Sequence, residues 1–69
     1  MDVKEFSNIG SKIRRERRLK GFSQSELSKK LEISPSYLNL IESGRRTITV
    51  PLLIKLGNEL GLSLKDLTM

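Results

Sequence analysis

The chain has 69 residues and a formal net charge of +5, from 13 Lys and Arg against 8 Asp and Glu, and it contains no cysteine and no histidine. Such a short chain predicts one domain, residues 1–69, without room for a catalytic cleft, and the absence of Cys and His argues against disulfides, metal sites, cofactors and enzymatic activity. No 18-residue apolar run and no secretory signal are visible, so the cytoplasm is the expected compartment, and the surplus of positive charge favours a polyanionic partner.

The first predicted helix, about residues 8–20, starts at Ser7 or Asn8 and runs to Lys20, with Gly21 as its stop. Ile9 and Ile13 lie four residues apart and would form its buried stripe. Six basic residues follow within the same segment. This basic run is either a solvated helix face or a surface for a polyanion. Its apolar stripe is too narrow for insertion into a membrane.

The second predicted helix, residues 24–31, begins with a capping box. Ser23 and Glu26 have the spacing at which the hydroxyl accepts from an amide of the first turn and the carboxylate accepts from the amide of the cap residue. Leu27 and Leu31 share one face of a 3.6-residue period and should point into a core.

The third predicted helix, residues 35–43, has Ser34 as its cap and Pro35 at its first position, where a missing amide costs nothing. The connection between the second and third helices is too short for antiparallel packing, and its length is typical of a helix-turn-helix, whose helices cross at roughly 90 to 120°. With Leu38 and Ile41 facing inward, the residues expected to point outward are Ser36, Tyr37, Asn39, Leu40 and Ser43.

Two further helices, residues 50–60 and 64–68, are predicted from a Thr49 cap and from a second capping box. The expected inward face of the fourth helix consists of Val50, Leu53, Ile54, Gly57 and Leu60. Gly57 costs about 1 kcal/mol against alanine inside a helix. Close approach of another helix would explain it, and mutational drift is the alternative.

Five short helices with a helix-turn-helix at the second and third form an all-α, compact arrangement that resembles the lambda repressor and Cro family (XRE family) of bacterial and phage regulators. The resemblance rests on IGSKIRRER, GFSQSEL, ISPSYLNLIESG and LGLSLKDL, in that order. The combination of SPSYLNLIE with RRTITVPLL is also similar to restriction-modification controller proteins and to N-terminal domains of regulators of short-chain fatty acid metabolism. The resemblance implies a sequence-specific, double-stranded DNA-binding regulator of transcription.

The resemblance also implies roles for single residues. The outer side of the third helix would enter the major groove, where Asn39 can pair with adenine and Leu40 can meet a thymine methyl group. Base-reading candidates are Ser34, Pro35, Ser36, Asn39 and Leu40. Phosphate-binding candidates are Ser23, Gln24, Tyr37, Ser43, Arg45 and Arg46. For Gln24 and Leu40 the alternative is a side chain that merely faces solvent, and for Asn39 it is one that faces solvent or a phosphate.

Arg17 and Glu42 match a structural ion pair that the family uses to join the first helix to the end of the third. Removal of one partner should cost several kcal/mol, because the other charge is left desolvated. Glu16, Ser28 and Glu32 depart from the family's pattern. At Glu32, where the turn often has glycine, a positive φ would cost roughly 1 kcal/mol.

Regulators of this family usually read an operator as two copies, so we expect a homodimer on a palindrome with half-sites about 10 to 11 base pairs apart. Four apolar residues could form the partner surface or close the bottom of the core: Leu52, Leu64, Leu67 and Met69. Dimerisation could instead reside in a missing C-terminal part of a longer chain. The alternative function is an antitoxin or another protein-interaction module with the same fold, which a large apolar patch away from the basic face would favour.

Overall fold

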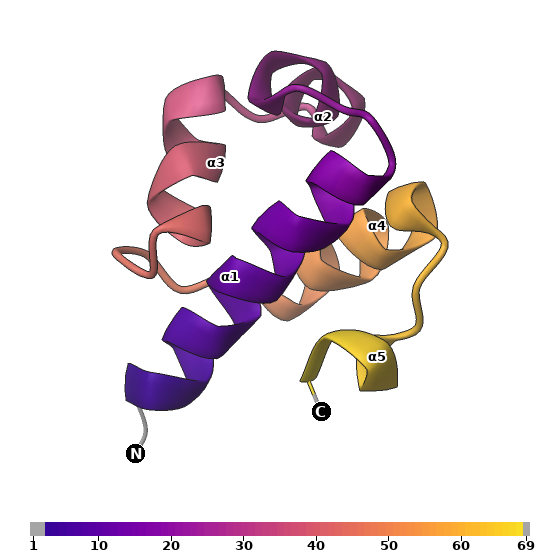
Figure 1. Ribbon diagram of the computed structural model, residues 1–69. Helices are drawn as coiled ribbons and strands as arrows, with labels where there is room; N and C mark the ends of the chain where they lie inside the picture. Colours follow the sequence, from indigo (N-terminus) through magenta and orange to yellow (C-terminus); the bar gives the residue numbers. More distant parts are fainter. Residues whose placement is uncertain (1–2, 69) are drawn as a thin grey trace.

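Five helices follow one another in the computed structural model, which describes the backbone of residues 3–68 and the side chains of residues 9–63 and 65–67. No strand is present in residues 3–68, so the all-α prediction is confirmed. The helices are α1 (Val3–Leu19), α2 (Gln24–Leu31), α3 (Pro35–Glu42), α4 (Val50–Leu60) and α5 (Leu64–Thr68) (Figure 1).

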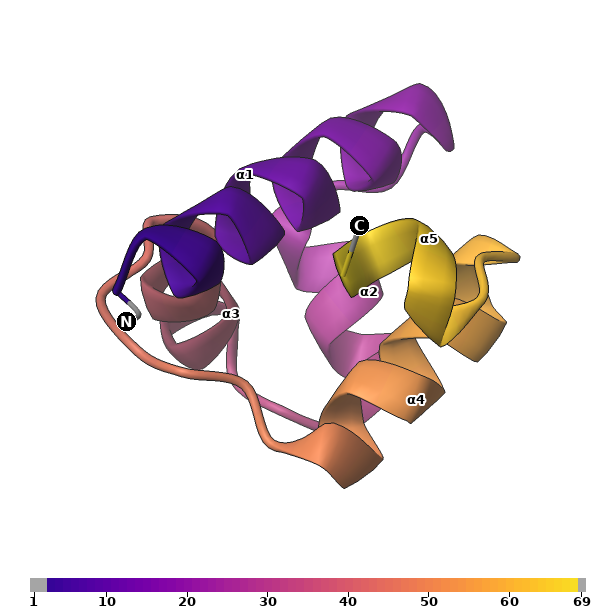
Figure 2. The same ribbon diagram turned by 90° about the horizontal axis from the view of Figure 1, so that it is seen from below.

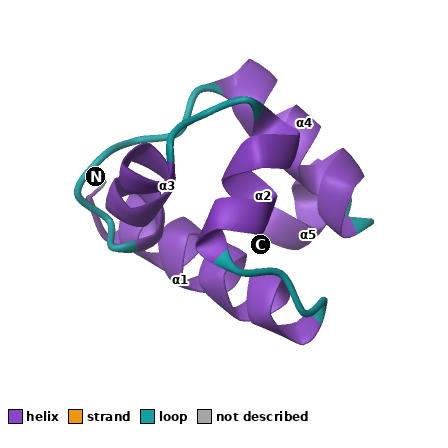
Figure 3. Ribbon diagram, turned by 90° about the horizontal axis from the view of Figure 1, so that it is seen from above, coloured by secondary structure: helices purple, strands orange, loops and turns teal. Residues whose placement is uncertain are grey.

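The helices are arranged so that α3 stands apart from the C-terminal pair. α1 packs against α3 and α5, α2 packs against α3 and α4, and α4 packs against α5. Seen from below and from above, α3 lies at one side of the domain and α4 with α5 at the other, and α2 lies between them (Figure 2 and Figure 3). Residues 43–49 connect α3 to α4 along the outside (Figure 2). α3 is therefore held mainly by α1 and α2, and one of its sides has no helix packed on it.

Local capping groups begin α2 and α3 at the predicted residues. Ser23 Oγ accepts from the Glu26 N–H at 3.0 Å, and Glu26 Oε1 accepts from the Ser23 N–H at 2.8 Å. Ser34 Oγ accepts from the Tyr37 N–H at 3.0 Å, and Pro35 is the first residue of α3. Each bond satisfies a backbone group that a helix end otherwise leaves without a partner.

The turn between α2 and α3 has the left-handed conformation expected at a position where glycine is common. Glu32 has φ 62° and ψ 39°, and its N–H donates to the Lys29 carbonyl at 3.1 Å. The next N–H, that of Ile33, donates to the Ser28 carbonyl at 2.9 Å. Lys55 Nζ of α4 lies 3.2 Å from Glu32 Oε1, but both side chains are exposed, so the pair adds little stability.

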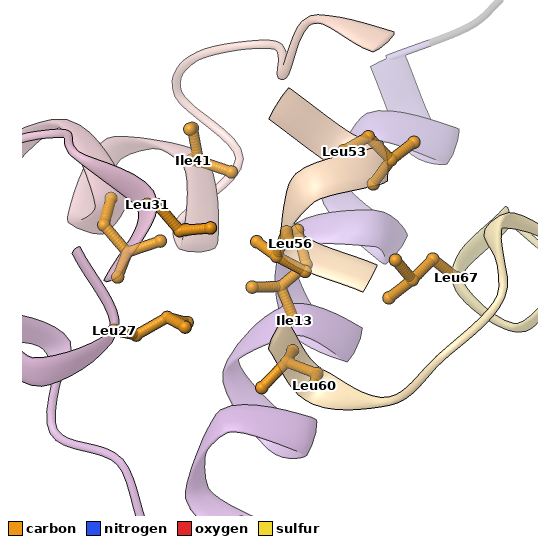
Figure 4. Close-up of a cluster of buried hydrophobic side chains, with 9 residues drawn as sticks. Ile13, Leu27, Leu31, Ile41, Leu53, Leu56, Leu60 and Leu67 are labelled. Atoms are coloured by element: carbon orange, nitrogen blue, oxygen red, sulfur yellow. The ribbon is translucent and has the colours of Figure 1, made fainter. Parts of the chain in front are cut away.

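The hydrophobic core takes side chains from every helix. The close-up in Figure 4 shows leucine and isoleucine side chains converging between the helices. Among the described side chains, no buried nitrogen or oxygen lacks a hydrogen-bond partner. The buried apolar residues are Ile13, Leu27, Leu31, Leu38, Ile41, Leu53, Leu56, Leu60 and Leu67.

Three predicted helix ends were wrong. α1 begins at Val3 and ends at Leu19 instead of running from about residue 8 to residue 20, so Ser7 and Asn8 lie inside the helix. No proline or glycine stands before Ser7, and lysine and glutamate favour helix, so a residue that can cap does not have to interrupt the helix. α3 ends at Glu42, one residue earlier than predicted, because Ser43 is its C-terminal cap residue.

The predicted inward face of α4 was wrong at two positions. Val50 is 60% exposed and Ile54 is 49% exposed, whereas Leu56, which the prediction omitted, is fully buried. The stripe that α4 actually buries has the helical spacing of i, i+3, i+4 and i+7: Leu53, Leu56, Gly57 and Leu60. The segment VPLLIKL is apolar on most sides, so its periodicity alone does not say which side meets the core.

Two glycines permit close backbone contacts. A Cβ at Gly57 would lie 2.7 Å from the Leu62 carbonyl oxygen, so the close approach comes from the segment between α4 and α5 and not from another helix. A Cβ at Gly10 would collide with the carbonyl oxygens of Ile41 and Glu42. α1 can cross the end of α3 at this short distance because residue 10 has no side chain.

The four apolar residues considered for a partner surface have different positions. Leu67 is 1% exposed and belongs to the core, so it is not available to a partner, and Leu52 is half-buried against the same core. The side chains of Leu64 and Met69 lie outside the described residues. None of the described helices has the length and apolar character needed to span a membrane.

Candidate nucleic-acid interface

The outer side of α3 forms an open surface together with the first residue of α2. A shallow hollow there is lined by Gln24, Pro35, Ser36, Asn39 and Leu40. Ser36 and Asn39 are exposed. Leu40 is half-buried, but its side chain is not one of those that pack against the core. The structure thus brings four of the five base-reading candidates to one surface that the described part of the chain leaves uncovered.

A buried ion pair holds the end of α3 against α1. Arg17 Nε lies 2.7 Å from Glu42 Oε2, and Arg17 Nη2 donates to Glu42 Oε1 at 3.2 Å. Arg17 Nη1 also donates to the Phe22 carbonyl at 2.8 Å. Glu42 is 2% exposed and Arg17 is 6% exposed. The pair named from the resemblance is therefore present as a two-pronged contact, a geometry that fixes orientation as well as distance.

Two further side chains reach the same carboxylate. Arg14 Nε donates to Glu42 Oε1 at 3.4 Å, and Gln24 Nε2 donates to the same oxygen at 3.0 Å. The sequence reasoning missed both contacts. Arg14 could have been found, because it precedes Arg17 by three residues and so shares its helix face. Nothing local pointed to Gln24, because its distance to Glu42 depends on how α2 docks onto α3.

The side chain of Gln24 also contacts the candidate base reader Asn39. Asn39 Nδ2 donates to Gln24 Oε1 at 3.5 Å. Gln24 was expected to bind a phosphate, and in the structure its oxygen and one of its N–H groups face protein atoms. The second Nε2–H has no partner among the described residues and stays available. The three side chains form a chain of hydrogen bonds from the buried Glu42 to the exposed Asn39.

The segment after α3 carries two exposed arginines next to the hollow. The N–H groups of Arg45 and Arg46 donate to the Leu40 carbonyl at 2.9 and 3.2 Å, so the segment wraps the end of α3. The Arg46 guanidinium lies 5.7 Å from the centre of the half-buried Tyr37 ring. These two arginines place positive charge next to Leu40, which lines the hollow, while Arg14 and Arg17 both pair with the carboxylate of Glu42.

The serine candidates have structural tasks in the described chain. Ser23 and Ser34 use their hydroxyl oxygens as acceptors at the starts of α2 and α3, and Ser43 Oγ donates to the Leu40 carbonyl at 3.2 Å. A capping hydroxyl keeps its own hydrogen, so Ser23 and Ser34 can still donate to a ligand. Among the described residues, no group of three or more carboxylates or other ligating side chains could hold a metal ion.

Comparison with known proteins agrees with this geometry. Residues 13–67 match the profile of the family HTH_3, described as helix-turn-helix. The chain is 47% identical over 53 residues to the HTH-type transcriptional regulator RamB of Mycobacterium tuberculosis. This match covers 77% of the chain but only 11% of RamB. The chain therefore spans about a tenth of the length of this relative.

Solved structures share the arrangement of helices over most of the chain. The biofilm regulator SinR, determined in complex with DNA, has a TM-score of 0.80 and 35% identity, and the match covers 86% of this chain and 95% of the SinR chain in that structure. The restriction-modification controller protein C.AhdI from Aeromonas hydrophila has a TM-score of 0.87 and 26% identity, with 93% and 97% coverage. The likeness to restriction-modification controllers that the sequence suggested is confirmed at the level of the fold.

Proposed function

The chain belongs to the helix-turn-helix family HTH_3, and on this premise we propose that its domain binds double-stranded DNA sequence-specifically and that the protein regulates transcription. One observation carries the proposal: the outer side of α3 is uncovered, and the segment that follows it carries two exposed arginines, Arg45 and Arg46. A helix presented in this way fits the major groove, where hydrogen bonds and apolar contacts distinguish base pairs. The domain is a binding module and not an enzyme.

The contacts divide into two kinds in this proposal. Ser36, Asn39 and Leu40 read base edges, since they stand on the uncovered side of α3. Arg45 and Arg46 hold phosphates with their forked donors. In the same proposal the N–H groups at the start of α2 bind a phosphate, because the N-terminal end of a helix attracts anions. Phosphate contacts set the position on the duplex, and base contacts set the sequence.

We propose further that two copies bind a palindrome, with half-sites about 10 to 11 base pairs apart, in the cytoplasm of a bacterium or a phage host. A single domain has few base-reading side chains, and a symmetric pair doubles the contacts that distinguish a site from the rest of a genome. The dimer contact would come from surfaces other than Leu67, which is buried in the core.

The protein-interaction alternative finds less support. Among the described residues, the exposed large apolar side chains are Leu19 on α1 and the pair of Val50 and Ile54 on α4. Two neighbouring side chains make a much smaller patch than the several hundred Å² typical of a protein-binding surface. The charge around the hollow favours DNA over a protein partner.

Selection of bound sequences from a random duplex library, with the mass of the complex measured, tests the proposal. A palindromic consensus bound by two chains is the expected result, and recovery of unenriched sequences contradicts it. With about four phosphates neutralised by each copy, log affinity should fall against log salt with a slope of about −7.

Two charge variants sharpen the salt measurement. Arg46→Ala should weaken binding to all DNA sequences alike. It should also make the slope of log affinity against log salt shallower by about 1 for each copy. Lys65→Ala removes the same charge from α5, on the side of the domain away from α3, and should leave the slope unchanged (Figure 2). Equal effects of the two variants would contradict the position assigned to the phosphate contacts.

A further inference from the structure

We propose that the buried Glu42, acting through Gln24, sets the direction of the Asn39 amide and thereby makes Asn39 select adenine over guanine. Gln24 and Glu42 are positioning residues in this proposal, and Asn39 is the residue that touches the base. The inference rests on the proposed function, because it needs α3 in the major groove. It adds a prediction about which base is read and about a residue that does not touch that base.

The first step is the direction of Gln24. A carboxylate only accepts hydrogen bonds, and Glu42 Oε1 lies 3.0 Å from the Gln24 side-chain nitrogen. Turning the amide around would put its oxygen against this carboxylate oxygen. Arg17 holds both oxygens of the carboxylate, Oε2 at 2.7 Å and Oε1 at 3.2 Å, so the carboxylate itself cannot easily rotate away. Gln24 must therefore keep its nitrogen toward Glu42 and its oxygen toward α3.

The second step is the direction of Asn39. Gln24 Oε1 only accepts, so the Asn39 side chain presents its nitrogen, at 3.5 Å. A planar amide has one N–H on the same edge as its oxygen and one N–H pointing away from it. In this proposal the N–H that points away makes the contact with Gln24. The other edge, with one acceptor and one donor, is then left for the open hollow, which Asn39 lines.

The third step is the base that fits this edge. Adenine offers an N7 acceptor and an N6–H donor in the major groove, which complement one N–H and one oxygen. Guanine offers the two acceptors N7 and O6 and would leave the Asn39 oxygen facing another oxygen. An Asn39 amide turned the other way would exchange the positions of its oxygen and its nitrogen, so that an N–H would face the base atom at position 6, where guanine has its O6 acceptor. The hydrogen-bond chain from Glu42 therefore excludes the guanine-reading orientation.

The burial of the three side chains supports the proposed order, in which Glu42 positions Gln24 and Gln24 positions Asn39. The Glu42 end of the chain is 2% exposed and rigidly paired, Gln24 is half-buried, and Asn39 is exposed. Gln24 and Asn39 both line the hollow on the outer side of α3. Direction is thus set at the buried Glu42 and is passed through the part-buried contact of Gln24 to the exposed contact with Asn39.

The test repeats the random-duplex selection with Gln24→Met, Asn39→Ala and the double variant. Methionine keeps the length of the side chain and removes both amide contacts. Circular dichroism checks that each variant is folded. The wild type should prefer adenine at one position in each half-site, and Asn39→Ala should reduce the adenine-to-guanine ratio there by about tenfold or more. Gln24→Met should reduce the same ratio by about threefold or more by admitting guanine, with other positions unchanged. The double variant should equal Asn39→Ala at this position.

Each contrary outcome has a distinct meaning. If the wild type selects no sequence, the proposed function fails and the inference fails with it. If Asn39→Ala leaves the consensus unchanged, or if the preferred base at its position is not adenine, the inference is overturned while the proposed function stands. If Gln24→Met weakens binding to all DNA sequences alike without changing the adenine-to-guanine ratio, Gln24 contacts a phosphate and is not a positioning residue. Ser25→Ala, an exposed neighbour on α2, serves as the control that changes no ratio.

Discussion

The junction of α1 with α3 and the junction of α4 with α5 hold the domain in different ways. The first joins a close backbone crossing at Gly10 to a buried ion pair between Arg17 and Glu42. The second is apolar, with Leu67 buried in the core and the Leu62 carbonyl lying over Gly57. Apolar burial has no direction, whereas charge-assisted hydrogen bonds do. The directional junction is the one that supports the proposed DNA-binding surface.

The largest expected effect comes from breaking the polar junction. Glu42→Ala leaves Arg17 buried without its partner and should lower the free energy of unfolding by about 3 to 5 kcal/mol. Urea denaturation measures the loss. Replacement of both partners, as Arg17→Met with Glu42→Leu, should recover much of this stability, because no charge is then left buried. A Glu42→Ala cost of only a few tenths of a kcal/mol would mean that the pair is solvated.

The apolar side of the comparison is tested with two residues of α4. Leu56→Ala should lower the free energy of unfolding by about 2 to 5 kcal/mol, since it opens a cavity in the core. Ile54→Ala, on the same helix and half exposed, is the matched control and should cost clearly less. Denaturation of the two variants under identical conditions gives the ranking. The reverse ranking would favour the face of α4 that the sequence alone predicted.

The smallest effect is expected at the start of α5. The Ser63 N–H donates to Asp66 Oδ2 at 2.9 Å, and this bond, followed by one from the Ser63 side chain, lowers the pKa of Asp66 below its ordinary value of 3.8. The carboxylate therefore stabilises the folded state above pH 3.8, and this contribution disappears as the pH falls through the lower folded-state pKa. The stability difference between wild type and Asp66→Asn should shrink in that range. A difference independent of pH from 7 to 2 would refute this role.

The sequence predicted helix bounds correctly where they depend on residues close together along the chain. The bounds of α2, α4 and α5 coincide with the predicted ranges, because a cap acts on an amide about three residues away. The start of α1 was wrong, since Ser7 is able to cap but sits in a segment that continues as helix. The inward side of α4 was wrong because a helix with apolar residues on several sides has no single stripe to read.

The difference between what the sequence determined and what the tertiary structure decided is clearest at Gln24. The amino-acid order by itself determined that this residue opens α2 and that Asn39 stands on the outer side of α3, since both follow from caps and helical period within a few residues. Only the docking of α2 and α1 onto α3 decided that Gln24 connects Asn39 to Glu42, across 15 and 18 residues of chain. Hydrogen bonds of this kind depend on distances between helices, and those distances are set by how the core packs.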